Sequence, residues 1–228
     1  MEIETAAAND PVLAPGTVLS DLPIFPLPNA VHFPNTLLPL HVFEPRYRQL
    51  VRHAMSGGRR IAVALLAPGW EPQYYGAPAI HPVMGLGEVI SHQELPDGRS
   101  NILLRGIARI RLIEEQRSDL EFRLVRARVE ECASGSSEEL GRHLATVRQL
   151  FTNVVARTGL DVSEAEVLFT DTMEPGLVLD AIASATPGEA ERKQQLLAAP
   201  CLETRAMLLA DLLADVVAGS IGPEPAEG

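Results

Sequence analysis

The chain has 228 residues, of which 46% are apolar and 21% are charged, so it is long enough to bury a hydrophobic core without disulfides or a structural metal. Its formal net charge is −11, and the excess acid lies in residues 1–20 and 132–228, while residues 21–131 are almost neutral. An acidic surface repels phosphate backbones, so the composition disfavours nucleic acid as a partner of residues 132–228 and leaves it open for residues 21–131.

Neither end of the chain shows the pattern of a targeting or membrane segment. Residues 1–20 and 220–228 are rich in Ala, Pro, Gly and acids without periodicity, and we expect both to be disordered tails. No apolar run approaches the roughly 20 residues that a membrane helix needs. The two cysteines, Cys132 and Cys201, lack paired spacing, so no disulfide or zinc site is indicated. We therefore expect a cytoplasmic protein.

Residues 21–131 carry the patterns of a β-rich subdomain. Short β-type segments at 22–27 and 37–43 are separated by a turn-forming stretch, and the near-continuous apolar run at 61–67 is typical of a buried strand. Residues 122–129 alternate apolar side chains with arginines, as a half-buried strand does. The sequence thus predicts a succession of short strands.

One helix is predicted to interrupt these strands, at residues 45–56. Pro45 suits the first turn of a helix, and Gly57 ends it. Between them, Tyr47 and Leu50 belong to an apolar stripe at helical spacing. We expect this stripe to pack on the sheet.

A β-hairpin is the clearest local prediction. Two β-type segments, 83–95 and 100–113, flank a turn at 96–99 that contains Asp97 and Gly98. An Asp-Gly pair supplies the positive backbone angles that a tight hairpin turn requires. We therefore expect Asp97 and Gly98 to have a structural role.

Residues 132–219 are predicted to form a helical bundle, and the acidic, Ser-rich stretch at 130–139 has the composition of a boundary. Two candidate helix starts have the spacing of a capping box, Ser163 to Glu166 and Thr186 to Glu189. In the second, Pro187 takes the favoured first position of the helix. The helices are expected near 138–157, 163–173, 176–185, 189–198 and 201–218. Together the two halves predict an α+β fold, a β-barrel-like half followed by helices.

Seven sequence blocks have the character of family motifs. They are LPIFPLP at 22–28, HFPN at 32–35, LPLHVFEPRYR at 38–48, GLGEVI at 85–90, LPDGR at 95–99, LRGIAR at 104–109, and QQLL at 194–197 followed by Arg205. In order and spacing these blocks resemble the amino-terminal domain of Lon proteases, in particular the short bacterial proteins that contain only this domain. The blocks extend over almost the whole chain between its tails.

The resemblance implies a fold and a function. Lon amino-terminal domains have a β-barrel like that of pseudouridine synthases and archaeosine transglycosylases (PUA-like), followed by a helical bundle, and they help to select unfolded substrates. The chain has no GxxxxGK[S/T] phosphate-binding loop and lacks the length for an ATPase and a protease domain. We therefore expect neither unfolding nor cleavage of substrates.

No motif for catalysis or metal binding is present. The six histidines form no HExxH or paired Cys/His pattern, and neither Ser56 nor Ser134 lies in a nucleophile elbow. Gly85 and Gly87 lack the third glycine of a dinucleotide fingerprint, and they more readily permit close backbone approach. We expect no catalytic residue, no metal and no cofactor.

The block around Glu44, Arg46 and Tyr47 has the character of a motif, and two interpretations compete. Glu44 could serve as a base with Arg46 as an anion clamp. Alternatively, the negative charge of Glu44 is stabilised by the positive end of the helix dipole and neutralised by Arg46 or Arg48. Tyr47 then belongs to the apolar stripe. We favour the structural interpretation.

Aromatic residues concentrate in one loop-like stretch. Trp70, Tyr74 and Tyr75 fall within residues 68–78, although the chain has only one Trp, three Tyr and six Phe. Loops lie on the surface, where aromatic rings supply large contact areas. We predict that these three residues contribute to binding, and the alternative is that they fold back to cap the barrel.

Three functions are compatible with the sequence. The leading hypothesis is a non-catalytic module that binds unfolded or extended polypeptide in an apolar groove near the barrel–bundle junction, with a protease or chaperone system as a possible collaborator. The second is an RNA-binding PUA-like module, because residues 21–131 hold 13 arginines. The third is a small enzyme that no motif reveals.

Overall fold

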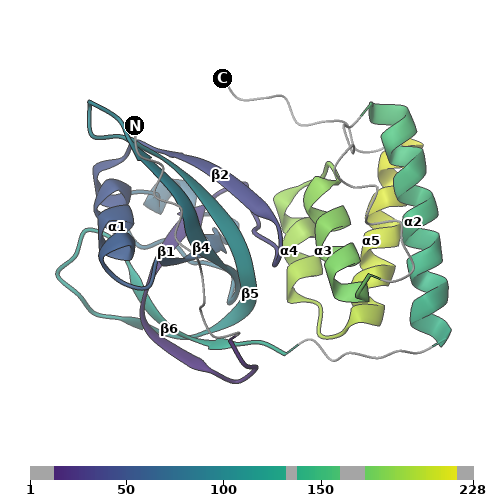
Figure 1. Cartoon of the computed structure of the whole chain (residues 1–228), viewed down its shortest axis with the longest axis horizontal. Helices are drawn as coiled ribbons and strands as arrows, with labels where there is room; N and C mark the ends of the chain where they lie inside the picture. The colour runs from purple at the N-terminus through teal and green to yellow at the C-terminus, as the bar shows by residue number, and fades with distance from the viewer. Residues whose placement is uncertain (1–12, 132–137, 160–172, 220–228) are drawn as a thin grey trace. The chain divides into compact units, whose positions relative to one another are not determined.

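The computed structural model describes residues 13–131, 138–159 and 173–219. The chain divides into two compact units, Met1–Glu131 and Cys132–Gly228 (Figure 1). In the described residues the first unit holds six strands and one α-helix, and the second unit holds four α-helices. The fold class is therefore α+β, as predicted.

The six strands of the first unit form one mixed sheet in the order β2-β5-β4-β3-β1-β6, and β5 also pairs with β6. The pairings of five strands therefore return to their starting point, while β2 is attached through β5 alone. Only β1 and β3 are parallel. The strands are β1 (Val18–Leu27), β2 (Leu37–Val42), β3 (Arg60–Leu65), β4 (Val83–Glu94), β5 (Ser100–Gln116) and β6 (Leu124–Val129).

The strands bury apolar residues on both of their faces. Neighbouring residues of a strand point to opposite faces, so Ile24 joins one apolar cluster and Phe25 the other. Ala62 and Val63 of β3 separate in the same way. This arrangement explains why the run at 61–67 contains no polar residue.

Helix α1 (Pro45–Ser56) covers one of these clusters, and its bounds are those predicted (Figure 1). Its buried residues are Tyr47, Leu50, Val51 and Ala54, which recur at the spacing of one helix face. The same cluster contains Phe25 of β1, whose ring stacks on Tyr47 with centroids 4.2 Å apart. The apolar stripe therefore packs on the sheet, as expected.

Glycines let the loop before β2 pass directly over the sheet. A Cβ atom on Gly85 would lie 2.0 Å from the carbonyl oxygen of His32, and one on Gly106 would lie 2.0 Å from that of Phe33. His32 is consequently buried, and burial lowers its pKa to about 4, so its imidazole is neutral near pH 7. The expected close backbone approach is confirmed for Gly85.

The predicted hairpin joins β4 to β5 through the five residues 95–99. Only Gly98 takes a positive φ, of 77°, and its N–H donates to the carbonyl of Leu95 at 2.8 Å. The Asp97 carboxylate accepts hydrogen bonds from the backbone N–H and the Nε of Arg99, and the backbone bond is the main reason that its pKa is lowered. A Cβ atom on Gly98 would collide with the guanidinium of Arg48. With five residues between the strands, this loop is longer than a two-residue hairpin turn.

The second unit contains α2 (Glu138–Thr158), α3 (Pro175–Ala185), α4 (Ala190–Ala198) and α5 (Leu202–Ala218). Each lies within one or two residues of a predicted helix. The prediction for 163–173, including the cap at Ser163, falls outside the described residues except for residue 173. Among the described residues, no helix combines the length and the apolar character needed to cross a membrane.

The predicted capping box at Thr186 is wrong. Helix α4 begins only at Ala190, after Glu189. The hydroxyl of Thr186 instead donates backwards to the carbonyl of Ile182, at 2.6 Å, and so it completes the end of α3. A threonine side chain reaches a carbonyl four residues earlier as readily as an N–H three residues later, and spacing alone does not distinguish the two.

A buried ion pair links α3 to α5. Arg205 Nη1 donates to Asp180 Oδ1 at 2.6 Å, and the two side chains are 2% and 6% exposed. Gln194 of α4 is also buried. Arg205 and Gln194 belong to the carboxy-terminal blocks that resemble the Lon domain, and here they are core residues of the second unit.

Candidate functional site

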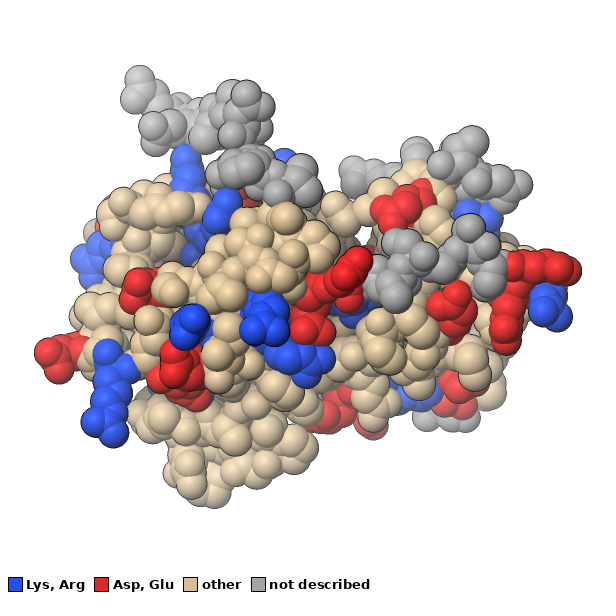
Figure 2. Space-filling view, turned by 90° about the horizontal axis from the view of Figure 1, so that it is seen from below, with Lys and Arg blue, Asp and Glu red and all other residues tan. Residues whose placement is uncertain are grey.

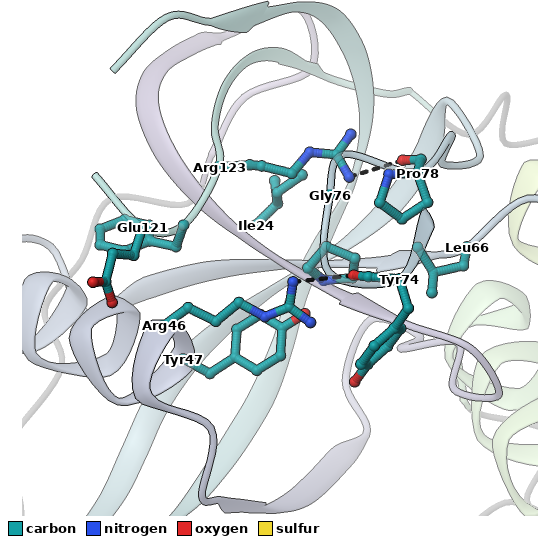
Figure 3. A pocket seen from close by; sticks show the side chains of 11 residues that line it. Ile24, Arg46, Tyr47, Leu66, Tyr74, Gly76, Pro78, Glu121 and Arg123 are labelled. Atoms are coloured by element: carbon teal, nitrogen blue, oxygen red, sulfur yellow. Dashed lines mark hydrogen bonds between the residues drawn. The ribbon is translucent and has the colours of Figure 1, made fainter. Parts of the chain in front are cut away.

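The site begins at the corner between β2 and α1, where Glu44, Arg46 and Tyr74 meet. The Glu44 carboxylate accepts a hydrogen bond from Arg46 Nε at 3.0 Å and one from the Tyr74 hydroxyl at 2.7 Å. Arg46 Nη1 donates to the backbone carbonyl of Tyr74 at 3.1 Å (Figure 3). These bonds fasten the aromatic loop, residues 68–78, to the start of α1.

The Glu44 side chain makes no hydrogen bond with the amides of the helix that it precedes. Its backbone carbonyl begins the helix by accepting from the N–H groups of Tyr47 and Arg48, and its carboxylate turns to the loop. Arg46 is therefore the partner of Glu44, while Arg48 lies against Gly98. The corner and the aromatic loop are therefore joined by side-chain hydrogen bonds.

The guanidinium of Arg46 lies against three tyrosine rings. Its central carbon is 4.5 Å from the ring centroid of Tyr47, 5.0 Å from that of Tyr74 and 5.8 Å from that of Tyr75. Distances of this size allow attraction between a cation and the electron-rich ring face. Arg46 therefore holds the rings as well as the carboxylate.

Two of these phenols hold their protons at neutral pH. Burial raises the pKa of Tyr47 to about 12. The pKa of Tyr74 is also raised, first by burial and then by its hydrogen bond to Glu44. In the described part of the chain, no group of three or more His, Cys, Asp or Glu residues is placed to hold a metal ion. Tyr47 and Tyr74 are therefore uncharged in the corner near pH 7.

An open hollow of about 690 Å³ lies beside the corner. Phe43 and Tyr75 stand at its mouth, with 60% and 88% of their surfaces exposed. The other lining residues are Glu44, Pro45, Arg46, Tyr74 and Glu121. Exposed aromatic rings around a concave surface are the usual anchors of protein recognition.

A small cavity adjoins the hollow, and Arg46, Tyr74 and Glu121 line both (Figure 3). Its volume of about 30 Å³ has room for water and not for a side chain of a partner. Arg123 Nη1 donates to the carbonyl of Pro78 at 2.9 Å on the far side of this cavity. The aromatic loop is therefore fastened at two points, Tyr74 and Pro78.

The three predicted aromatic residues have three different environments. Tyr75 is exposed, Tyr74 is half-buried and hydrogen-bonded, and Trp70 is half-buried with its ring 5.5 Å from that of Tyr74. Trp70 does not line the hollow. Tyr74 thus has the position expected of a cap, and Tyr75 the position expected of a binding residue.

Three lining residues, Phe43, Pro45 and Glu121, were not among the predicted site residues. Along β2 and the residue after it, exposed and less exposed positions alternate, with Val42 buried and Phe43 exposed. This alternation was visible in the sequence and would have placed Phe43 outside. Glu121 lies in the loop before β6, and no local pattern marks it.

Many arginines of the first unit are paired with acids in the described residues. Six of them pair with carboxylates: Arg46 with Glu44, Arg99 with Asp97, Arg105 with Glu88, Arg111 with Glu130, Arg123 with Glu115, and Arg126 with Glu114. Figure 2 shows basic and acidic groups next to one another on the face in view. Such pairing weakens the hypothesis of RNA binding, which requires clustered positive charge.

Comparison with known proteins decides the family. The model of the substrate-binding domain of the ATP-dependent protease La (Lon) matches residues 21–215. The chain belongs to the Lon substrate-binding domain family. The match begins within β1 and ends within α5, so this Lon domain includes both units.

Relatives of this Lon domain are much longer proteins. The Lon protease of Desulfosudis oleivorans is 25% identical over 77% of this chain and 21% of its own length. That of Heliobacterium modesticaldum is 27% identical over 86% of this chain and 24% of its own length. The chain thus spans about a fifth to a quarter of the length of these relatives.

Two solved structures share the fold. The amino-terminal domain of a Mycobacterium avium complex Lon protease superposes with a TM-score of 0.68 at 15% identity, covering 85% of this chain and 98% of that one. The Lon amino-terminal domain protein of Xanthomonas campestris gives a TM-score of 0.59 at 23% identity, covering 87% and 98%. At these identities the likeness concerns the fold alone.

Proposed function

We propose that this Lon domain is a non-catalytic module that binds unfolded or extended polypeptide at the hollow beside α1. The observation that carries the proposal is the exposure of Phe43 and Tyr75 at the mouth of that hollow. Membership of the family supports a role in recognising protein substrates. The proposed site lies within the first unit, whereas the groove at the barrel–bundle junction stays a prediction.

The hydrogen bonds around the two exposed rings support the proposal. Binding costs less entropy when the binding residues already occupy their bound positions. Tyr75 follows Tyr74, whose hydroxyl and carbonyl are both hydrogen-bonded to the corner. Phe43 directly precedes Glu44 in the same corner. Both exposed rings therefore belong to residues next to the hydrogen-bonded corner.

Exposed rings suit a partner that is an extended chain. Such a chain presents apolar side chains that a folded protein would bury, and aromatic rings can contact many of them with little demand on sequence.

The absence of phosphate-loop and nucleophile-elbow motifs supports binding without ATP hydrolysis or cleavage. We infer a collaborating ATP-dependent protease from the Lon relatives. The circuit of strand pairings supports a PUA-like barrel.

The test compares binding of a fluorescently labelled, permanently unfolded model protein by wild type, Phe43→Ala and Tyr75→Ala. Each substitution is expected to weaken binding about fivefold to thirtyfold, which corresponds to about 1–2 kcal/mol. Met207→Ala is the matched control, because Met207 is 53% exposed and lies on α5, outside the hollow.

Equal affinities for all four proteins would show that the hollow is not the binding site. Thermal unfolding of each variant accompanies the titrations, so that a loss of fold is not mistaken for a loss of binding. Removal of exposed side chains is expected to leave the melting temperature almost unchanged.

A further inference from the structure

We infer that the hollow prefers a polypeptide that places an arginine side chain in it, between the aromatic rings and the carboxylate of Glu121. This inference rests on the proposed function and deepens it, since it names the side chain that the site selects.

The hollow keeps one uncompensated negative charge. Of its lining residues, Glu44 and Glu121 are acidic and Arg46 is basic. Glu44 is paired with Arg46 and also accepts from Tyr74. Glu121 accepts a hydrogen bond from the Gln49 amide at 2.7 Å, a neutral partner that leaves its charge in place. A cationic side chain in the hollow would complement that charge.

The rings already accommodate one guanidinium. Arg46 lies within 4.5–5.8 Å of the centroids of three tyrosine rings. The exposed surfaces of Tyr75 and Phe43 offer the same kind of contact on the solvent side. Aromatic faces attract cations and stack well on the planar guanidinium group.

Arginine fits this combination better than other side chains do. Its planar fork can stack on a ring and donate to a carboxylate at the same time, whereas lysine presents a point charge without a planar face. An aliphatic side chain would contact the rings but not Glu121, and an acidic one would be repelled. The net charge of −11 also favours the approach of basic segments.

The experiment measures how the full chain binds two labelled, extended peptides that differ at one position, arginine in one and citrulline in the other. Citrulline keeps the planar shape and removes the charge. The arginine peptide is expected to bind about fivefold to twentyfold more tightly, the combined effect of an exposed cation–ring contact and an exposed ion pair. The preference should shrink as salt is raised.

The variant Glu121→Gln locates the effect. It is expected to reduce the preference for arginine to about twofold or less and to leave the affinity for the citrulline peptide unchanged. Glu131→Gln serves as the matched control, because Glu131 is also exposed and does not line the hollow. It should retain the full preference.

Two outcomes would overturn the inference alone. The first is equal affinity for both peptides, and the second is a preference that survives Glu121→Gln, because the selectivity would then arise from the overall charge of the chain. Failure of both peptides to bind would overturn the inference together with the proposed function.

Discussion

Two carboxylate–guanidinium pairs, one in each unit, differ in what surrounds them. Asp180 and Arg205 join two helices and are almost completely buried, at 6% and 2% exposure. Glu44 and Arg46 lie two residues apart at a corner, at 17% and 18% exposure, and they share their hydrogen bonds with the aromatic loop. The first pair is confined to the core, whereas the second stands between the core and the hollow.

Burial decides how much an ion pair contributes to stability. A buried pair makes each partner indispensable, because the loss of one leaves a charge without solvent or counter-charge. A partly exposed pair is screened by water and adds less to stability. It is then available to position other groups, as Glu44 and Arg46 position the loop.

The largest expected effect is at the buried pair. Asp180→Ala should lower the free energy of unfolding by about 3–5 kcal/mol, because Arg205 would be left charged within the second unit. Urea unfolding followed by circular dichroism measures the loss. The double variant Asp180→Leu, Arg205→Met should recover most of it, and a double variant as unstable as the single one would contradict the argument from burial.

A buried histidine of the first unit tests whether burial, rather than the unit in which a group lies, decides its effect on stability. The pKa of His32 is about 4 in the folded state and 6.5 in the unfolded state. Only the unfolded chain therefore gains a proton between these values, so stability is complete above about pH 6.5 and falls as the pH decreases to about 4. The loss should reach about 3 kcal/mol.

The comparison with His32→Gln isolates this contribution. Unfolding free energies of both proteins are measured at several pH values from 7.5 to 4. The difference between them should change by about 3 kcal/mol over that range, since glutamine does not titrate. A constant difference would show that His32 is protonated in the folded protein as readily as in the unfolded one.

An intermediate effect is expected at the corner. Glu44→Ala should lower the free energy of unfolding by about 1–2 kcal/mol, between the values typical of exposed and of buried pairs. Damage to stability should exceed damage to binding, because Glu44 fastens the loop rather than contacting a partner through an exposed surface. Full stability with lost binding would reverse this ranking.

The smallest effect on stability is expected at Tyr75. Its ring is 88% exposed, so Tyr75→Ala should change the free energy of unfolding by less than about 0.5 kcal/mol. Tyr74→Phe removes a hydroxyl that is hydrogen-bonded to Glu44 and should cost about 1 kcal/mol. If the two variants proved equally stable, the distinction between a fastening residue and an exposed residue within the loop would be lost.

Local patterns predicted the elements well and their caps less well. The alternation at 122–129 and the stripe that contains Tyr47 identified β6 and α1, because each depends on the faces of a single segment. The cap at Thr186 failed, because its hydroxyl had two possible partners that sequence spacing does not rank. The concentration of aromatic residues at 68–78 indicated the site without separating Tyr74 from Tyr75.

The type and order of the described elements and the family could be predicted from the sequence, since these depend on the spacing of residues along the chain. Which aromatic residue is fastened and which is exposed depends on tertiary contacts. Tyr74 meets its partners Arg46 and Glu44 across 28 and 30 residues, and Glu121 meets Gln49 across 72. Contacts at such separations arise from the packing of α1 and the sheet around a common core, and no local pattern encodes them.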